Sequence, residues 1–150
     1  MKRRLFLGMM IVVTLGAAPA SVPAARLVLV TDAASEMPAI GSTEVRKLFL
    51  GKPLVKDGLR IQALRNETND LLREVFLQKV MFMSARDYER QLLSNVFREG
   101  GERPAAYDQP APLVEALRAK PGAVTYMWED AARATPNVKI VSELWQGSLE

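Results

Sequence analysis

An apolar run at residues 26–31, with the sequence RLVLVT, limits the folds open to this chain more than any other segment. Its length and its β-branched and leucine residues are typical of a strand that is buried on both faces. Strands of this kind occur mainly in parallel sheets whose two faces are covered by helices. The run therefore predicts a buried strand in an α/β fold.

Beyond this run, strand-like and helical segments alternate along the chain. Three more segments have the pattern of strands: residues 59–65, 123–128 and 137–141. Apolar residues at helical spacing predict helices at residues 42–50, 70–82, 84–98 and 112–120, with a helical turn at 129–134. Loops are expected at residues 32–41, 52–58, 66–69 and 99–109. This alternation implies α/β architecture with right-handed crossovers, in one domain that covers residues 25–150.

Short signals mark the ends of the expected helices. Ser42 is a plausible N-cap of the first helix, and Gly51 is expected to end it as the C′ residue. Ser84, with Asp87 three residues later, resembles a capping box at the start of a further helix. The inward stripe of that helix is expected to consist of Tyr88, Leu92, Leu93 and Val96.

The first 24 residues have the composition of a cleavable signal peptide. Lys2, Arg3 and Arg4 precede an apolar stretch at residues 5–17, and small residues follow it up to Ala24. The apolar stretch is shorter than the roughly 20 residues that a membrane-spanning helix needs. We therefore expect export to the periplasm, by either the general or the twin-arginine route.

Composition excludes several classes of protein. The chain contains no cysteine, so neither a lipoprotein anchor nor a disulfide is possible, and stability must come from a hydrophobic core. Without Lys2, Arg3 and Arg4 the 20 basic residues fall to 17, which equals the 17 acidic residues. A mature chain without net charge has no global attraction for nucleic acid, so a nucleic-acid partner is not expected.

Motifs for catalysis are also missing from the sequence. The chain has no histidine and no cysteine, which removes the commonest proton shuttle, the commonest metal ligand and the thiol nucleophile. It contains neither a G-x-S-x-G elbow nor a phosphate-binding G-x-x-x-x-G-K-[ST] loop. We therefore expect a protein that is not an enzyme and that has no catalytic residues, metal or cofactor.

The polar connection after the second expected strand is the best candidate for a binding site. If a strand ends at Arg65 and a helix begins soon after Thr68, free backbone N–H groups lie at the carboxyl edge of the sheet, where anions bind. Arg65 could add a bidentate guanidinium, and Asn66, Thr68 and Asn69 could add neutral donors. The alternative is that Thr68 or Asn69 only caps the helix while Arg65 pairs with Glu67.

Other residues bear on this hypothesis. Glu67 and Asp70 bring negative charge to the same turn and so weigh against an anion there. Thr31 lies at the exit of the first expected strand, and Arg103 lies in a glycine-rich loop from which it could reach an anion. Tyr126 is expected to fill the core rather than to line a pocket.

Several fragments together resemble a known family. Phe-Leu-Gly-Lys at residues 49–52, the strand at 59–65 with its polar exit, and Pro-Gly-Ala-Val-Thr-Tyr at 121–126 are similar to segments of the phosphate-binding component of ABC transporters. Phe97, Gly101, Arg103 and Pro104 resemble a loop in short members of that group. The resemblance extends over residues 26–141.

The resemblance implies a fold and a function. The implied fold is a three-layer α/β/α single lobe, like one half of a type II periplasmic binding protein. The implied function is that of a solute-binding module for phosphate or a similar small oxyanion, with an ABC permease or another periplasmic or membrane protein as partner. Arg65 matches the position of the arginine that contacts phosphate in the family.

This chain also departs from the family pattern. It has about half the length of a two-lobe member, residues 67–69 (Glu-Thr-Asn) replace the family's Ser-Gly-Thr turn, and Thr125 replaces a glycine. A second hypothesis follows from these departures, namely an accessory or interaction protein that kept the fold and lost the ligand. The sequence leaves both hypotheses open.

Overall fold

The computed structural model describes residue 16 and residues 24–149 of the 150-residue chain. The predicted signal peptide lies outside the described residues, apart from Gly16 and Ala24. Among the residues that are described, no helix has the length and apolar character needed to span a membrane.

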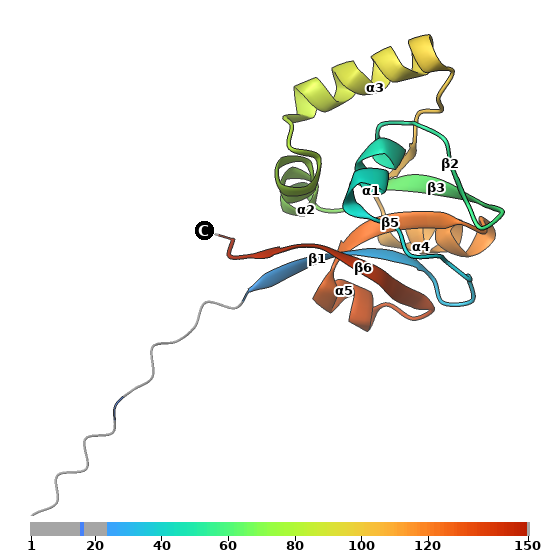
Figure 1. The fold of residues 1–150 in the computed structure, drawn as a ribbon. Helices are drawn as coiled ribbons and strands as arrows, with labels where there is room; N and C mark the ends of the chain where they lie inside the picture. Colours follow the sequence, from blue (N-terminus) through green and yellow to red (C-terminus); the bar gives the residue numbers. More distant parts are fainter. Residues whose placement is uncertain (1–15, 17–23, 150) are drawn as a thin grey trace, which may run out of the picture.

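One curled, six-stranded sheet forms the middle of the molecule (Figure 1). The strand order is β2-β3-β5-β1-β6, and β4 also pairs with β3. The strands are β1 (Ala25–Asp32), β2 (Leu54–Lys56), β3 (Leu59–Asn66), β4 (Ala105–Tyr107), β5 (Ala123–Trp128) and β6 (Val138–Gly147). β2 and β4 lie inside segments that the sequence predicts to be loops, and β6 ends at Gly147, six residues beyond the predicted end at Val141.

The strand directions correct one prediction. β3 is parallel to β4 and β5, but β1 is antiparallel to both of its neighbours, β5 and β6. The predicted burial of β1 is confirmed, because Leu27, Val28, Leu29 and Val30 are all at most 2% exposed. Helices on both faces of the sheet explain this burial, which depends on the covering layers and not on strand direction.

Helices cover both faces of the sheet and give the predicted three-layer α/β/α architecture. One face is covered by α1 (Ser42–Phe49), α2 (Asp70–Val75) and the π-helix η1 (Phe76–Met81), with α3 (Ala85–Glu99) packed outside these helices. The other face is covered by α4 (Pro110–Ala119) and α5 (Glu129–Ala134). Each layer has its own hydrophobic cluster against the sheet.

Three aromatic rings form the centre of the larger cluster. Phe76 stacks on Tyr126 with ring centroids 3.7 Å apart, and Phe49 contacts Phe76 at 4.9 Å in an edge-to-face arrangement. Tyr126 is therefore a core residue, as predicted, and burial raises the pKa of its phenol. The rings join α1, η1 and β5, so they hold one helical layer to the middle of the sheet.

Helix ends follow the local signals with one exception. Gly51 has a φ of +83° and follows the last turn of α1, as predicted. The side chain of Ser84 accepts a hydrogen bond from the N–H of Asp87 at 3.1 Å, which confirms the predicted start of α3. The prediction for α1 is wrong by one residue, because Gly41 is the N-cap and Ser42 is already helical.

The predicted helix at residues 70–82 is two elements. α2 runs directly into η1, whose wider turns place Phe76, Leu77, Val80 and Met81 in the core. Phe82 then takes a left-handed conformation with a φ of +56° and is 72% exposed. Packing against the sheet selects the wider turn, which residue periodicity does not reveal.

α3 packs only lightly on the rest of the molecule. Figure 1 shows it lying away from the sheet, beyond α1 and α2. Its buried residues are Tyr88 and Leu92, whereas Leu93, which the sequence predicts to face inward, is half exposed. The hydroxyl of Tyr88 donates a hydrogen bond of 2.5 Å to the carbonyl of Phe49, which ties α3 to the end of α1.

Candidate functional site

The connection from β3 to α2 has the predicted strand–turn–helix form. Arg65 and Asn66 are the last residues of β3, and Asn69 is the N-cap of α2. Both strand residues are buried, with Arg65 8% and Asn66 3% exposed. The site therefore begins with an arginine that is held inside the protein and not at its surface.

Three partners from the protein itself surround the guanidinium of Arg65. Its Nε donates to the carbonyl of Pro104 at 3.1 Å. Its Nη1 donates to the Glu89 carboxylate at 3.1 Å and lies 3.6 Å from the carboxylate of Glu67. The pairing of Arg65 with Glu67, which the sequence offers as the alternative, is thus present, and Glu89 adds a second carboxylate.

We call the charged residues around this guanidinium the Arg–Glu cluster; it consists of Arg65, Arg73, Arg103, Glu67 and Glu89. Glu89 is at its centre, because its Oε2 also accepts a hydrogen bond from Arg103 at 2.6 Å. Glu67 lies between Arg65 and Arg73, with 3.9 Å from its Oε1 to the Nε of Arg73. Three guanidinium groups therefore share two carboxylates.

Glu89 is the functional residue that the sequence did not indicate. It lies on α3, 24 residues from Arg65, and no short-range spacing connects the two. A weak signal exists, since Glu89 comes directly after Tyr88 and three residues before Leu92, at the border of the inward stripe of α3.

Glu89 is an ionised acceptor at neutral pH. Partial burial alone would raise its pKa, but the hydrogen bonds and charges of Arg103 and Arg65 outweigh burial and hold the pKa below the usual value of glutamate. The carboxylate thus acts as a fixed anion between two guanidinium groups.

The stabilisation by Glu89 is expected to depend on pH. A carboxyl whose pKa is lowered in the folded state stabilises the protein above its unfolded pKa, and this contribution is lost as the pH falls through its folded pKa. Glu89→Gln should therefore lower the free energy of unfolding by about 1 kcal/mol at neutral pH, and by progressively less as the pH falls through the lowered pKa of Glu89. Urea unfolding of both proteins across this range measures the difference.

The surface pair of Glu115 with Arg118 provides the control, because these side chains are 62% and 66% exposed. Glu115→Gln should change the free energy of unfolding by less than about 0.5 kcal/mol at every pH. A Glu89→Gln effect that stays constant from neutral to acidic pH would contradict the assigned role.

The backbone N–H groups of the turn mostly have partners. The N–H of Glu67 donates to the carbonyl of Tyr107 at 2.8 Å, and that of Thr68 donates to the Asn66 side chain at 3.1 Å. The side chain of Asn69 accepts from the N–H of Leu72 at 2.9 Å. Asn69 therefore caps α2, as the alternative prediction has it.

The neutral donors predicted for an anion are engaged as well. The side chain of Asn66 donates to the carbonyl of Tyr126 at 2.9 Å and accepts from the hydroxyl of Thr68 at 2.6 Å. Thr31 is fully buried in β1, where its hydroxyl donates to the carbonyl of Ala123 at 2.8 Å. Among the six predicted site residues, Arg65 and Arg103 are joined through the carboxylate of Glu89, and Asn66 is hydrogen-bonded to Thr68. Thr31 lies apart from them and bonds to β5.

The described residues contain no group of three or more acidic side chains arranged to hold a metal ion. The chemistry available at the cluster is ionic and consists of guanidinium groups, carboxylates and amides.

Comparison with known proteins gives a fold and no family. Neither a family model nor a curated protein sequence matches the chain. Among solved structures, the fold is similar to an ABC-type phosphate transport receptor from Vibrio cholerae, with a TM-score of 0.56, 11% identity, and coverage of 80% of this chain and 46% of that one. It is also similar to PstS from Borrelia burgdorferi, with a TM-score of 0.53, 12% identity, and coverage of 79% and 47%.

These similarities establish the architecture. The chain spans less than half the length of the two receptors it matches and has the fold of a single lobe of a periplasmic binding protein. The predicted fold is confirmed, and at this level of identity the likeness concerns the fold alone.

Proposed function

We propose that this chain is a periplasmic interaction module, not an enzyme, which keeps one lobe of the phosphate-receptor fold and fills the anion position with its own carboxylates. One observation carries the proposal: the Glu89 carboxylate accepts hydrogen bonds from both Arg65 and Arg103. In this proposal, a carboxylate shared by two guanidinium groups takes the place of an oxyanion. Arg65 matches the family arginine in sequence but has an internal partner.

The surroundings of the cluster support the same proposal. A phosphate that reached Arg65 would have to displace Glu89 and would still lie beside Glu67, and like charges at this distance repel. The donors that could compensate, on Asn66 and Thr68, are used within the turn.

Capture of a small oxyanion for ABC-type uptake is the second candidate function. It is favoured by the excess of three guanidinium groups over two carboxylates in the Arg–Glu cluster and by the phosphate receptor among the similar structures. In that function Arg65, Arg103 and the turn residues would exchange their internal partners for the ligand, and an ABC permease would be the partner.

Calorimetry with phosphate separates the two functions. We expect the wild-type chain to give no binding heat at millimolar inorganic phosphate, because Glu89 competes within the molecule. Glu89→Ala should bind phosphate with a dissociation constant in the millimolar range, that is, with roughly 4 kcal/mol of binding free energy. The gain has a direct cause, since the variant frees one donor of Arg65 and one of Arg103.

Glu115→Ala is the matched control, because it frees the exposed Arg118 and should create no binding. Micromolar binding of phosphate by the wild type, lost in Arg65→Ala, would overturn the interaction module in favour of oxyanion capture. Capture of a stable periplasmic or membrane partner by the immobilised chain, unaffected by Thr68→Ala, would support the interaction module.

A further inference from the structure

We propose that a basic cleft beside β3 is the docking site for an extended, acidic segment of a protein partner. The cleft lies between Lys52 and Pro53 after α1, residues 60–64 of β3, residues 100–105, and Lys120 after α4. This inference rests on the proposed interaction function and names the surface and the chemistry of the partner.

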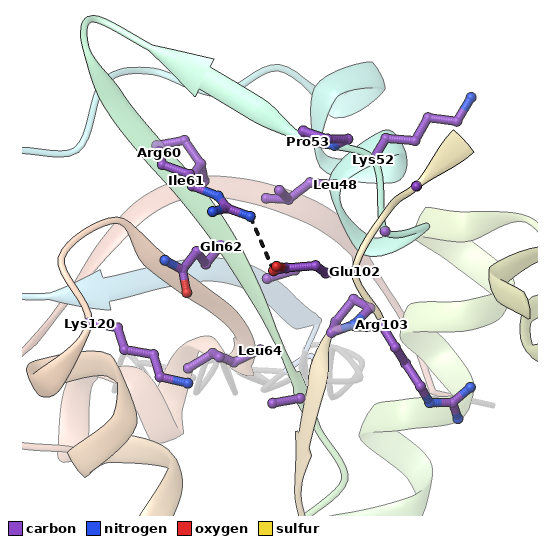
Figure 2. A pocket seen from close by; sticks show the side chains of 15 residues that line it. Leu48, Lys52, Pro53, Arg60, Ile61, Gln62, Leu64, Glu102, Arg103 and Lys120 are labelled. Carbon is purple, nitrogen blue, oxygen red and sulfur yellow. Dashed lines mark hydrogen bonds and ion pairs between the residues drawn. The ribbon is translucent and has the colours of Figure 1, made fainter. Parts of the chain in front are cut away.

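The cleft has a volume of about 270 Å³. Figure 2 shows the segment that carries Glu102 on one side of β3, and Gln62 and Lys120 on the other side of this strand. This volume is slightly below the range of pockets that enclose whole small molecules, which is about 300–1,000 Å³. It suits the insertion of one side chain from a partner whose backbone stays outside.

The edge of the sheet is interrupted at this point. β2 pairs with β3 as far as Ile61, and β4 pairs with β3 from Leu64 onward. Between these two ladders, Gln62 and Ala63 pair with β5 alone among the described residues. The gap between the two ladders is confined to Gln62 and Ala63, so it admits a side chain of an extended peptide beside β3 while the peptide backbone stays outside.

Charge selects an acidic peptide. Four basic residues line the cleft (Lys52, Arg60, Arg103 and Lys120), but Lys52 also pairs with Glu99 and Arg103 with Glu89. The charges that remain at the cleft are those of Arg60 and Lys120, against the single carboxylate of Glu102. Figure 2 shows Lys120 extending toward Leu64, whereas Lys52 and Arg103 extend away from the cleft. Arg60 and Lys120 are therefore the two cations that an inserted carboxylate would meet.

Glu102 marks the position of the partner's carboxylate. It forms an ion pair with Arg60 at 3.1 Å across the cleft (Figure 2). The Glu102 side chain is 81% exposed, and pairs of such exposed groups contribute little stability, so a partner can displace it at small cost. The partner's carboxylate would then bind Arg60 in its place and also reach Lys120.

Two glycines hold the wall of the cleft in shape. A Cβ atom on Gly51, which has a φ of +83°, would lie 2.8 Å from the carbonyl oxygen of Glu102. A Cβ atom on Gly101 would overlap the carbonyl oxygen of Gly51. These residues belong to the Phe-Leu-Gly-Lys segment and to the glycine-rich loop, so two of the fragments singled out in the sequence meet at this wall of the cleft.

The test uses a peptide probe of defined sequence. The full chain, labelled with ¹⁵N, is titrated with acetyl-Val-Glu-Val-Glu-Val-amide and, separately, with the same peptide carrying glutamine in place of glutamate. We expect the acidic peptide to shift the amide resonances of Gln62, Ala63 and Glu102, and the glutamine peptide to bind at least about ten-fold more weakly. Inorganic phosphate at the same ionic strength should leave these resonances in place.

Variants make the test specific. Lys120→Gln should weaken binding of the acidic peptide about five-fold, and Glu102→Gln should strengthen it by a similar factor because Arg60 is freed. Arg118→Gln, at the end of α4 but outside the cleft, should change nothing. Glu102→Gln removes only a surface carboxylate, so its gain in affinity can be measured without loss of folding.

Equal affinities for the two peptides would overturn the inference, and so would a Glu102→Gln variant that binds no more tightly than the wild type. These outcomes are distinct from failure of the proposed function. Phosphate binding at Arg65 would overturn the interaction module while leaving the peptide result unchanged. Capture of a partner whose affinity is unchanged by Lys120→Gln and by Glu102→Gln would support the interaction module and overturn the docking site.

Discussion

Arg65→Ala is expected to lower the free energy of unfolding by about 3 kcal/mol. Arg65 is 8% exposed, and its guanidinium bonds to the carbonyl of Pro104 and pairs with the carboxylates of Glu89 and Glu67. Its removal leaves a buried carbonyl without its donor and leaves Glu89 with Arg103 alone. Urea unfolding at neutral pH and moderate salt measures the loss.

Arg118→Ala serves as the control for this prediction. Arg118 also pairs with a glutamate at 3.0 Å, but both side chains are exposed, so its loss should change the free energy of unfolding by less than about 0.5 kcal/mol. The double variant Arg65→Ala, Glu89→Ala should be less destabilised than the sum of the single variants, because each partner alone is a charge without its pair. Additive losses would show that the two residues do not form one unit.

Phe76→Ala is expected to have the largest effect, a loss of about 4 kcal/mol in the free energy of unfolding. Phe76 is 1% exposed, stacks on Tyr126 at 3.7 Å and contacts Phe49 edge to face. The variant leaves a cavity between η1 and β5 and removes both aromatic contacts. Chemical unfolding gives the size of the loss.

The same variant is expected to disturb the candidate site. The carbonyl of Tyr126 accepts the side chain of Asn66 at 2.9 Å, so a shift of β5 into the cavity would weaken that hydrogen bond. A change in the side-chain amide resonance of Asn66 should therefore accompany Phe76→Ala. Leu71→Ala, on the exposed face of α2, is the matched control and should cost less than about 1 kcal/mol. Equal losses for the two variants would contradict the central role of the aromatic rings.

The alternation of strands and helices was predictable because each segment is governed by contacts within a few residues. The buried strand β1 and the strand β5 follow from their apolar patterns. The caps at Ser84 and Asn69 follow from side-chain groups that bond to backbone N–H groups three residues away. Such signals are local, and the fold preserves them.

Of the elements that were missed, β2 pairs with the adjacent β3 across a short turn, whereas the others depend on neighbours distant in sequence. β4 is a strand because Ala105 and Ala106 lie beside the end of β3, about 40 residues away in the chain. The wider turns of η1 depend on packing of Phe76 and Met81 against the sheet. The antiparallel direction of β1 also depends on which strands it meets, and a doubly buried strand has the same composition in either direction.

At the candidate site, the part that the sequence predicts and the part that only the structure shows can be separated more clearly than in the fold. The sequence alone determined the α/β class, the buried strand, the strand–turn–helix connection and the presence of Arg65 at its start. Only the tertiary structure decided what Arg65 binds, because Glu89 and Pro104 arrive from α3 and from the segment before β4. Periodicity and capping act over one or two helical turns, whereas the partner of a buried charge is chosen by the packing of whole layers.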